Sequence, residues 1–182
     1  MSGVFEEQPL DPKIHNRADF DCGVLALNDY LQRYADQHRK CSISSTYVLV
    51  EPEAPERILG YYTLSAAEIA CALLDERERR KLPRYPIPCF RLGRLACHVD
   101  WQGRGLGKRM IASATDRCLI ARTHVAAYAL TVDAKNDDAR AFYTRYGFKP
   151  LLGQALTMYL PLAAISGQFF DEDRPCDFSQ VG

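Results

Sequence analysis

Three glycines alternate with other residues at one point of the chain, between a strand-like stretch and a helix-like stretch. Residues 92–99 form an apolar run of strand length, and residues 109–121 show helical spacing. Gly103, Gly105 and Gly107 lie between them. Because glycine adopts backbone angles that side chains forbid, such a turn lets successive N–H groups point inward. The free N–H groups and dipole of the following helix favour an anion, so the sequence predicts a diphosphate-binding turn.

Two better-known phosphate loops do not fit this stretch. The dinucleotide fingerprint requires G-x-G-x-x-G, whereas the spacing here is G-x-G-x-G and no matching βαβ unit follows. A P-loop requires G-x-x-x-x-G-K-[ST], but Gly107-Lys108 is followed by Arg109, and Gln102 stands five positions before Gly107. A purely structural turn remains the alternative interpretation of the three glycines.

Residues 102–107 (Gln-Gly-Arg-Gly-Leu-Gly) resemble the Q/R-x-x-G-x-G/A pyrophosphate loop of the GCN5-related N-acetyltransferases, the GNAT superfamily. Residues 136–148 follow in the expected order and resemble the family segment N-x-x-A-x-x-F-Y-x-x-x-G-F. The resemblance covers roughly residues 4–162. It implies an α/β (α+β) GNAT fold, with a mixed central sheet of about six to seven strands that is splayed between the fourth and fifth strands and has helices on both faces.

The hydrophobic pattern is consistent with this fold without the motifs. Strands are predicted at residues 4–10, 46–50, 58–69, 92–99, 125–133 and 156–160. Helices are predicted at residues 24–40, 75–82, 109–121 and 137–146. Residues 46–50 and 58–69 should form an antiparallel hairpin, and prolines 83, 86 and 88 predict an extended linker before the central strand.

A narrower resemblance concerns the GNAT toxins of type II toxin–antitoxin modules. Residues 20–35, which include Phe20-Asp21-Cys22-Gly23 and Leu27-Asn28-Asp29-Tyr30-Leu31, resemble their first-helix segment. Residues 60–65, 82–88 and 92–96 also resemble that group. The resemblance implies acetylation of the amino group of an aminoacyl-tRNA, a homodimer, and neutralisation by a ribbon-helix-helix antitoxin. One departure is Ser44-Ser45, where that group often carries an arginine.

The resemblance implies acetyl-CoA as cofactor, with its diphosphate on the backbone of residues 102–108 and its pantetheine arm along the central strand. The cofactor-binding residues expected on this basis are Leu95, Ala96, Cys97, Gln102, Gly103, Arg104, Gly105, Leu106, Gly107, Lys108 and Asn136. Asn136 has a second interpretation, as a helix cap.

Tyr143 is the predicted catalytic acid. A phenol with a pKa near 10 is protonated at neutral pH, so it can donate a proton to the departing thiolate. Packing on the helix face is the alternative role, and Tyr146 is the second candidate for the acid. No general base is evident. Cys97 as a covalent nucleophile is the rival mechanism, although a buried cysteine more often acts as a small apolar residue.

The formal net charge of the chain is zero, which argues against simple bulk attraction to nucleic acid. Basic residues nevertheless gather locally, and each cluster is either a solvated helix face or an RNA contact. The RNA-binding candidates are Arg33, Arg39, Lys40, Arg79, Arg80, Lys81 and Arg84. The seven cysteines are scattered without a C-x-x-C pair and the four histidines lack ligand spacing, so no metal site is expected.

We expect residues 1–165 to form one GNAT domain and residues 166–182 to be an acidic tail, loose or partner-dependent. The absence of a basic-apolar leader and of a long apolar run predicts no signal peptide and no membrane-spanning helix, and the scattered, odd number of cysteines favours the reducing cytoplasm. Two other functions remain open. One is a GNAT that acetylates a small amine or a protein N-terminus, and the other is a catalytically silent acyl-CoA-binding regulatory protein.

Overall fold

The computed structural model describes residues 4–165, so the predicted acidic tail at residues 166–182 lies outside the described residues. The chain forms two compact units. The first unit comprises the residues up to Ser65 together with Gly93–Ala114, and the second comprises Ala66–Leu92 together with the residues from Thr115 onward. We describe each unit by itself.

The first unit contains an antiparallel arrangement of strands. Strand β1 (Glu6–Pro9) pairs with β2 (Ser45–Val50), and β2 pairs with the first half of β3 (Gly60–Ile69). Ser45 lies opposite Leu64, and Leu49 lies opposite Gly60. These pairs confirm the hairpin that the sequence predicts. Strand β2 is rich in β-branched and aromatic residues, which favour a pleated, half-buried surface.

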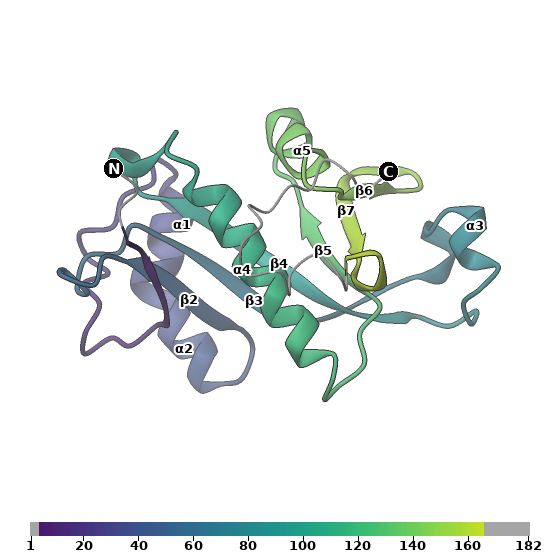
Figure 1. Ribbon diagram of the computed structural model, residues 1–182, viewed down its shortest axis with the longest axis horizontal. Helices are drawn as coiled ribbons and strands as arrows, with labels where there is room; N and C mark the ends of the chain where they lie inside the picture. Colours follow the sequence, from purple (N-terminus) through teal and green to yellow (C-terminus); the bar gives the residue numbers. More distant parts are fainter. Residues whose placement is uncertain (1–3, 166–182) are drawn as a thin grey trace. The chain divides into compact units, whose positions relative to one another are not determined.

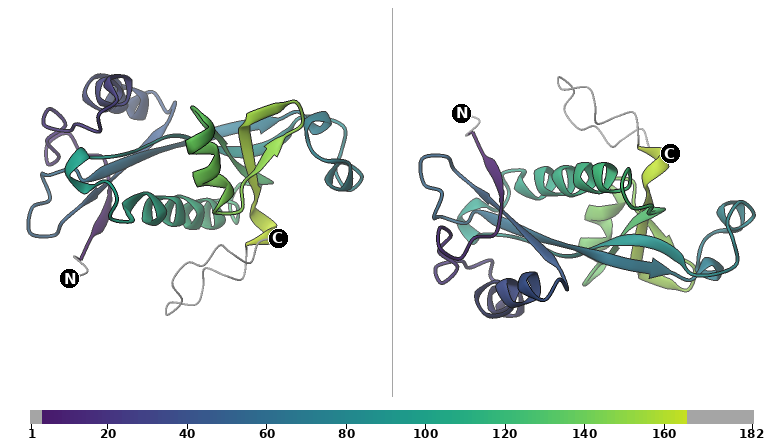
Figure 2. Two further views of the ribbon diagram at one scale, coloured as in Figure 1. Left: turned by 90° about the horizontal axis from the view of Figure 1, so that it is seen from above. Right: turned by 90° about the horizontal axis from the view of Figure 1, so that it is seen from below.

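Helices cover both faces of these strands (Figure 2). On one face, the segment predicted as a single helix is α1 (Leu25–Asp29), a π-helical turn (Tyr30–Tyr34) and α2 (Ala35–Lys40). On the other face lies the beginning of α4 (Leu106–Ala121). One hydrophobic cluster of its core contains Leu10, Phe20, Cys22, Tyr30, Leu31, Ala35, Val48, Val50, Ile58, Tyr61 and Ala96.

The second unit holds the parallel part of the sheet. Strand β4 (Ile87–Cys97) runs parallel to β5 (Ala129–Asp133). Strand β7 (Gln154–Pro161) is antiparallel to β5 and to the short β6 (Lys149–Leu151). The seven strands have the order β1-β2-β3-β4-β5-β7-β6, which confirms the expected mixed sheet (Figure 1).

The pairing of β4 with β5 ends at Leu92 and Val132. The five residues of β4 that follow, Gly93–Cys97, have no paired residue in β5 among the described residues. This loss of pairing is the splay that the resemblance implies between the fourth and fifth strands. It leaves one edge of β4 without a neighbouring strand, so its backbone groups are available to an extended ligand.

Two short helices complete the second unit. Helix α3 (Glu76–Arg79) follows β3 and a 3₁₀ turn (Cys71–Leu73). Helix α5 (Asp137–Thr144) is followed by Gly147, whose φ of +88° is typical of the residue after a helix. The core of this unit consists of Ile69, Cys71, Leu74, Ile87, Cys89, Ala129, Leu151 and Tyr159.

The largest differences from the sequence prediction concern strands β4, β5 and β6. Strand β4 begins at Ile87, although the prolines predict a linker there. Its early part tolerates Pro88 because the Pro88 carbonyl still accepts a hydrogen bond from the Tyr128 N–H at 2.8 Å. Strand β6 is not predicted at all, since it has only three residues and contains Pro150. Proline is tolerated there because β6 lies at the edge of the sheet. Strand β5 begins at Ala129, later than predicted.

Candidate active site

The predicted diphosphate turn lies in the first unit, immediately before α4. Gly103 and Gly105 have φ angles of +74° and +81°, a region that side chains rarely adopt. A Cβ atom added to either glycine would meet nothing within 4 Å, so both face open space. Gly107 lies inside α4 and has no positive φ. Two of the three glycines are therefore required by the backbone, and both leave room for a ligand.

The N–H groups of the turn are free to donate. Within residues 4–165, no hydrogen-bond acceptor is found for the backbone N–H groups of residues 103–108. The first helical bond of α4 runs from the Arg109 N–H to the Gly105 carbonyl at 3.2 Å. Unpaired N–H groups at the start of a helix, together with its dipole, form a binding place for an anion. This donor set suits the diphosphate of coenzyme A.

The side chain of Gln102 holds the turn in position. Its Nε2 donates to the carbonyl oxygens of Cys22 and Cys97, each at 3.0 Å. These bonds connect the turn to the segment before α1 and to the end of β4. The Gln102 amide thus positions the turn through other residues, and the structure gives a specific role to a residue that the sequence marked only as part of the motif.

Cationic side chains surround the turn. The Arg104 guanidinium lies 4.8 Å from the centre of the Trp101 ring, and the Arg57 guanidinium lies 5.9 Å from the same ring. Arg109 stacks on Phe5 at 5.4 Å and donates to the Phe5 carbonyl at 2.9 Å. Lys108 makes no ion pair with any described residue. These positive charges favour the phosphates of the cofactor.

The predicted pantetheine strand, Leu95–Cys97, lies in the part of β4 that β5 does not cover. Ala96 is buried and belongs to the core, while Leu95 and Cys97 are half-buried. Burial raises the pKa of the Cys97 thiol to about 11, so at neutral pH the thiol is protonated. A protonated thiol is a poor nucleophile, which argues against Cys97 as a covalent catalyst.

Tyr143 and Asn136 lie in the second unit. Tyr143 is buried on α5, with its ring edge-on to Phe142 and Phe148. Burial raises the pKa of its phenol to about 12, so the phenol keeps its proton at neutral pH. Its hydroxyl has no hydrogen-bond partner among the described residues. Asn136 caps α5, since its Oδ1 accepts from the Ala139 N–H at 2.9 Å, which supports the capping interpretation.

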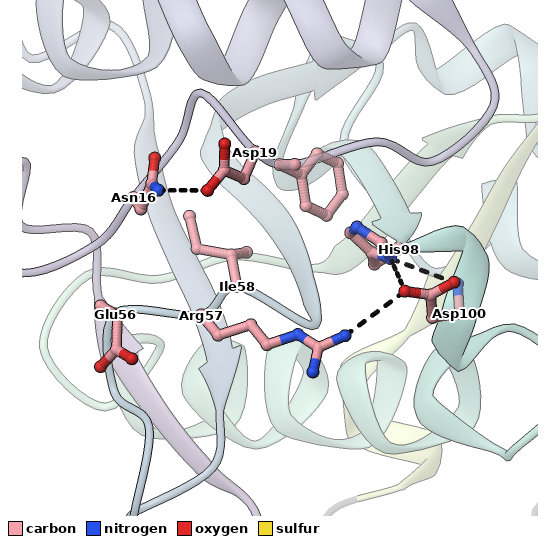
Figure 3. Close-up of a pocket in the computed structure, with 8 residues that line it drawn as sticks. Asn16, Asp19, Glu56, Arg57, Ile58, His98 and Asp100 are labelled. Atoms are coloured by element: carbon pink, nitrogen blue, oxygen red, sulfur yellow. Dashed lines mark hydrogen bonds and ion pairs between the residues drawn. The ribbon is translucent and has the colours of Figure 1, made fainter.

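A pocket of about 350 Å³ lies in the first unit between the segment before α1, the β2–β3 turn and the end of β4 (Figure 3). None of the residues predicted from the sequence lines it. Its charged groups are Asp19, Glu56, Asp100 and Arg57, and Arg57 contacts Asp100 at 3.3 Å. His98 also lines it and accepts a hydrogen bond from the Asp100 N–H through Nδ1. The excess of carboxylates makes this pocket unsuited to a diphosphate.

The two basic clusters differ in their pairing. Arg33, Arg39 and Lys40 all lie beside aspartates of their own helices, at 2.7–4.0 Å from Asp29 or Asp36. Hydrogen bonds from Lys40 and Arg39 hold the pKa of Asp36 below its usual value. In the other cluster, Arg80 pairs with Glu76, whereas Arg79, Lys81 and Arg84 have no ion pair among residues 4–165.

Arg94 is a residue that the sequence reasoning missed. Its guanidinium lies 3.5 Å from the centre of the Tyr30 ring, and the Tyr30 hydroxyl contacts Ser44 Oγ at 2.9 Å. The signal that marks it is its place in the central strand, three residues before Cys97.

Within the described residues, no group of histidines, cysteines and acidic residues is suited to a metal ion. No described helix is long and apolar enough to cross a membrane.

The comparisons with known proteins agree with this geometry. The family model described as "Acetyltransferase (GNAT) domain" matches residues 44–150. A "tRNA-acetylating toxin" from Mycobacterium tuberculosis is 35% identical over 130 residues, which cover 71% of this chain and 76% of that protein. A "Probable toxin TacT" from Sinorhizobium fredii is 28% identical over 166 residues, covering 87% of this chain and 91% of the relative.

Solved structures of toxins are also similar. AtaT complexed with acetyl-methionyl-tRNAfMet matches with a TM-score of 0.84 and 30% identity, covering 90% of this chain and 98% of that chain. AtaTR bound with AcCoA matches with a TM-score of 0.77 and 32% identity over 89% and 96% of the two chains. An AtaT mutant bound to the C-terminus of the antitoxin AtaR matches with a TM-score of 0.76 and 28% identity over 89% and 96%.

Proposed function

Because this chain belongs to the GNAT acetyltransferase family, we propose that it transfers the acetyl group of acetyl-CoA to the amino group of an aminoacyl-tRNA. The observation that carries the proposal is the similarity to AtaT complexed with acetyl-methionyl-tRNAfMet, which extends over 90% of this chain. The 35% identity to a tRNA-acetylating toxin supports the same acceptor. Acetylation of that amine would block its use in peptide-bond formation, as expected of a toxin.

The first unit would bind the cofactor. The free N–H groups of residues 103–108 would hold the diphosphate, and Arg104 and Lys108 would add positive charge. The uncovered edge at Leu95–Cys97 would pair with the peptide-like pantetheine arm. A backbone N–H of this edge would polarise the carbonyl under attack, a contribution of about 3 kcal/mol per donor. Acetyl-CoA, when bound, supplies a thioester that is activated toward amines.

The second unit would supply the acid. The amine nitrogen forms a bond to the acetyl carbon, the carbon–sulfur bond breaks, and the departing thiolate receives the phenolic proton of Tyr143. Burial raises the pKa of this phenol to about 12, so the proton is still on Tyr143 when the thiolate departs. The proton lost by the amine goes to water, since an aminoacyl ester amine has a low pKa and needs no strong base. Tyr143 therefore regains its proton from solvent after each turnover.

We further propose a cytoplasmic protein that forms a homodimer and is neutralised by an antitoxin of the ribbon-helix-helix type. The similarity to AtaT bound to the C-terminus of the antitoxin AtaR supports a protein partner. Sedimentation of the purified protein should give twice the 20.6 kDa mass of one chain.

The decisive experiment incubates the protein with labelled acetyl-CoA and total aminoacyl-tRNA. We expect label that, after nuclease digestion, is recovered as acetyl-amino acid, and we expect Tyr143→Phe to abolish nearly all of it. Label that enters only a polyamine or a peptide N-terminus would support the alternative acceptors. Failure to bind acetyl-CoA in calorimetry would leave only a silent regulatory role.

A further inference from the structure

A second pocket, of about 430 Å³, lies in the second unit and has not been assigned a role above. Arg79 of α3, Arg80 immediately after it and Arg84 of the following segment line it, together with Glu76, Cys71 and Ala72. The three arginines against one glutamate leave two positive charges in excess. The other two lining residues, Cys71 and Ala72, add no charged side chain to the pocket. We call this place the arginine pocket.

The arginine pocket is only partly neutralised by the protein itself. Arg80 contacts Glu76 at 2.5 Å. Arg79 and Arg84 are exposed and, across residues 4–165, make no ion pair. Unpaired guanidinium groups that converge on one cavity present planar sets of N–H donors, which match the oxygens of a phosphate or carboxylate. The pocket is therefore suited to an anion.

Helix α3 is short, but it is fixed to the sheet. Asp75 caps it, because its Oδ1 accepts from the Glu78 N–H at 2.9 Å. Glu78 accepts a hydrogen bond from the Tyr159 hydroxyl of β7, and Lys149 of β6 lies 3.7 Å from the same carboxylate. Glu78 is half-buried while its neighbour Arg79 is exposed. The contacts of Glu78 thus fix one side of α3, and the exposed Arg79 stays accessible.

The first basic cluster lacks these properties. Arg39 and Lys40 each contact Asp36 at 2.7 Å, and Arg33 lies 4.0 Å from Asp29. An anion that binds there must compete with aspartates already in place. This cluster lines neither the 350 Å³ pocket nor the arginine pocket. Of the two clusters that the sequence marked as RNA candidates, the second has arginines that make no ion pair within residues 4–165 and that line a cavity.

We propose that the arginine pocket binds backbone phosphates of the tRNA whose aminoacyl group is acetylated, an inference that rests on the proposed function. Arg79 and Arg84 contact the phosphates, and Arg80 remains paired with Glu76. Tyr85, adjacent to Arg84, exposes 63% of its surface and offers an aromatic ring for an unpaired base. The cluster of Arg33, Arg39 and Lys40 makes no comparable contact with RNA.

The test compares two double variants that remove the same charge, Arg79→Ala/Arg84→Ala and Arg33→Ala/Arg39→Ala. Aminoacyl-tRNA acetylation is measured at saturating acetyl-CoA and at several salt concentrations. We expect the first variant to raise the KM for aminoacyl-tRNA about tenfold with kcat nearly unchanged, because charge-assisted contacts to phosphate are lost. Its plot of log KM against log salt should lose a slope of about one per arginine. The second variant should resemble the wild type.

Each other outcome has one meaning. If the wild type acetylates no aminoacyl-tRNA, the proposed function is wrong. If the wild type is active and both double variants have the same KM, the arginine pocket is not the RNA site. An acidic protein partner that binds Arg79 and Arg84, with tRNA kinetics unchanged, would also overturn the proposal. Unchanged acetyl-CoA affinity in both variants serves as the folding control.

Discussion

The two compact units carry their functional groups in different forms. In the first unit the groups proposed to bind the cofactor are backbone N–H donors, exposed by the positive φ angles of Gly103 and Gly105. In the second unit the proposed functional groups are side chains. They are the phenol of Tyr143, proposed as the general acid, and the guanidinium groups of Arg79 and Arg84, proposed to contact RNA. A backbone site is set by local geometry, whereas a side-chain site depends on which partners distant elements provide.

The largest expected effect tests the chemical role of the second unit. Tyr143→Phe should lower kcat by about 100- to 10,000-fold, because the general acid is lost while the ring still packs against Phe142 and Phe148. Acetyl-CoA affinity, measured by calorimetry, should stay within about twofold, since the groups proposed to hold the diphosphate and the pantetheine arm, at residues 95–97 and 102–108, are unchanged. The matched control is Tyr146→Phe, and an equal loss of kcat in that variant would transfer the acid role to Tyr146.

The next effect tests the backbone site of the first unit. Gly105 and Gly153 both have positive φ and open space around an added Cβ, but Gly153 belongs to the second unit, in the turn between β6 and β7. Alanine in this conformation costs about 1 kcal/mol at either position. We expect Gly105→Ala to raise the KM for acetyl-CoA roughly tenfold, because its methyl group would project where the diphosphate approaches.

Gly153→Ala should lower the melting temperature about as much as Gly105→Ala does, but it should leave the KM for acetyl-CoA unchanged. Thermal unfolding and initial rates on both variants provide the measurement. An identical rise in KM for the two variants would mean that backbone strain alone, and not the position of the methyl group, affects cofactor binding.

The smallest effect concerns Cys97, in the first unit. The pKa of its thiol is about 11, above the pKa of a free cysteine, so the thiolate fraction at pH 8 is small and grows only as the pH rises toward that value. Iodoacetamide at pH 8 should therefore label the exposed Cys41 well before Cys97, as mass spectrometry can show. Cys97→Ala should keep kcat within about threefold. A loss of several hundredfold would instead support a covalent mechanism.

The contrast between the units also explains what could be predicted from the sequence. The glycine spacing at residues 103–107 and the hairpin of β2 and β3 are local patterns, and the structure agrees with both. Strand β6 was missed because three residues with a central proline give no periodic signal. The start of β4 was placed too late because Pro88 reads as a linker, while its carbonyl is paired with Tyr128 by the tertiary fold.

The two basic clusters could not be told apart by sequence. Both lie in short helical stretches, and both contain acidic residues nearby. What separates them is that Asp29 and Asp36 lie on the same helical face as their basic neighbours, whereas Glu78 turns toward Tyr159 of a distant strand. Sequence reasoning also identified Gln102 only as part of the motif, whereas the structure shows that its side chain positions the turn through two hydrogen bonds.

The two hydrogen bonds donated by the Gln102 side chain have a practical consequence. One amide group fastens the glycine turn to Cys22, 80 positions earlier in the chain, and to the last residue of β4. A compound or peptide that draws the Cys22 segment outward would distort the turn without ever competing with the nucleotide.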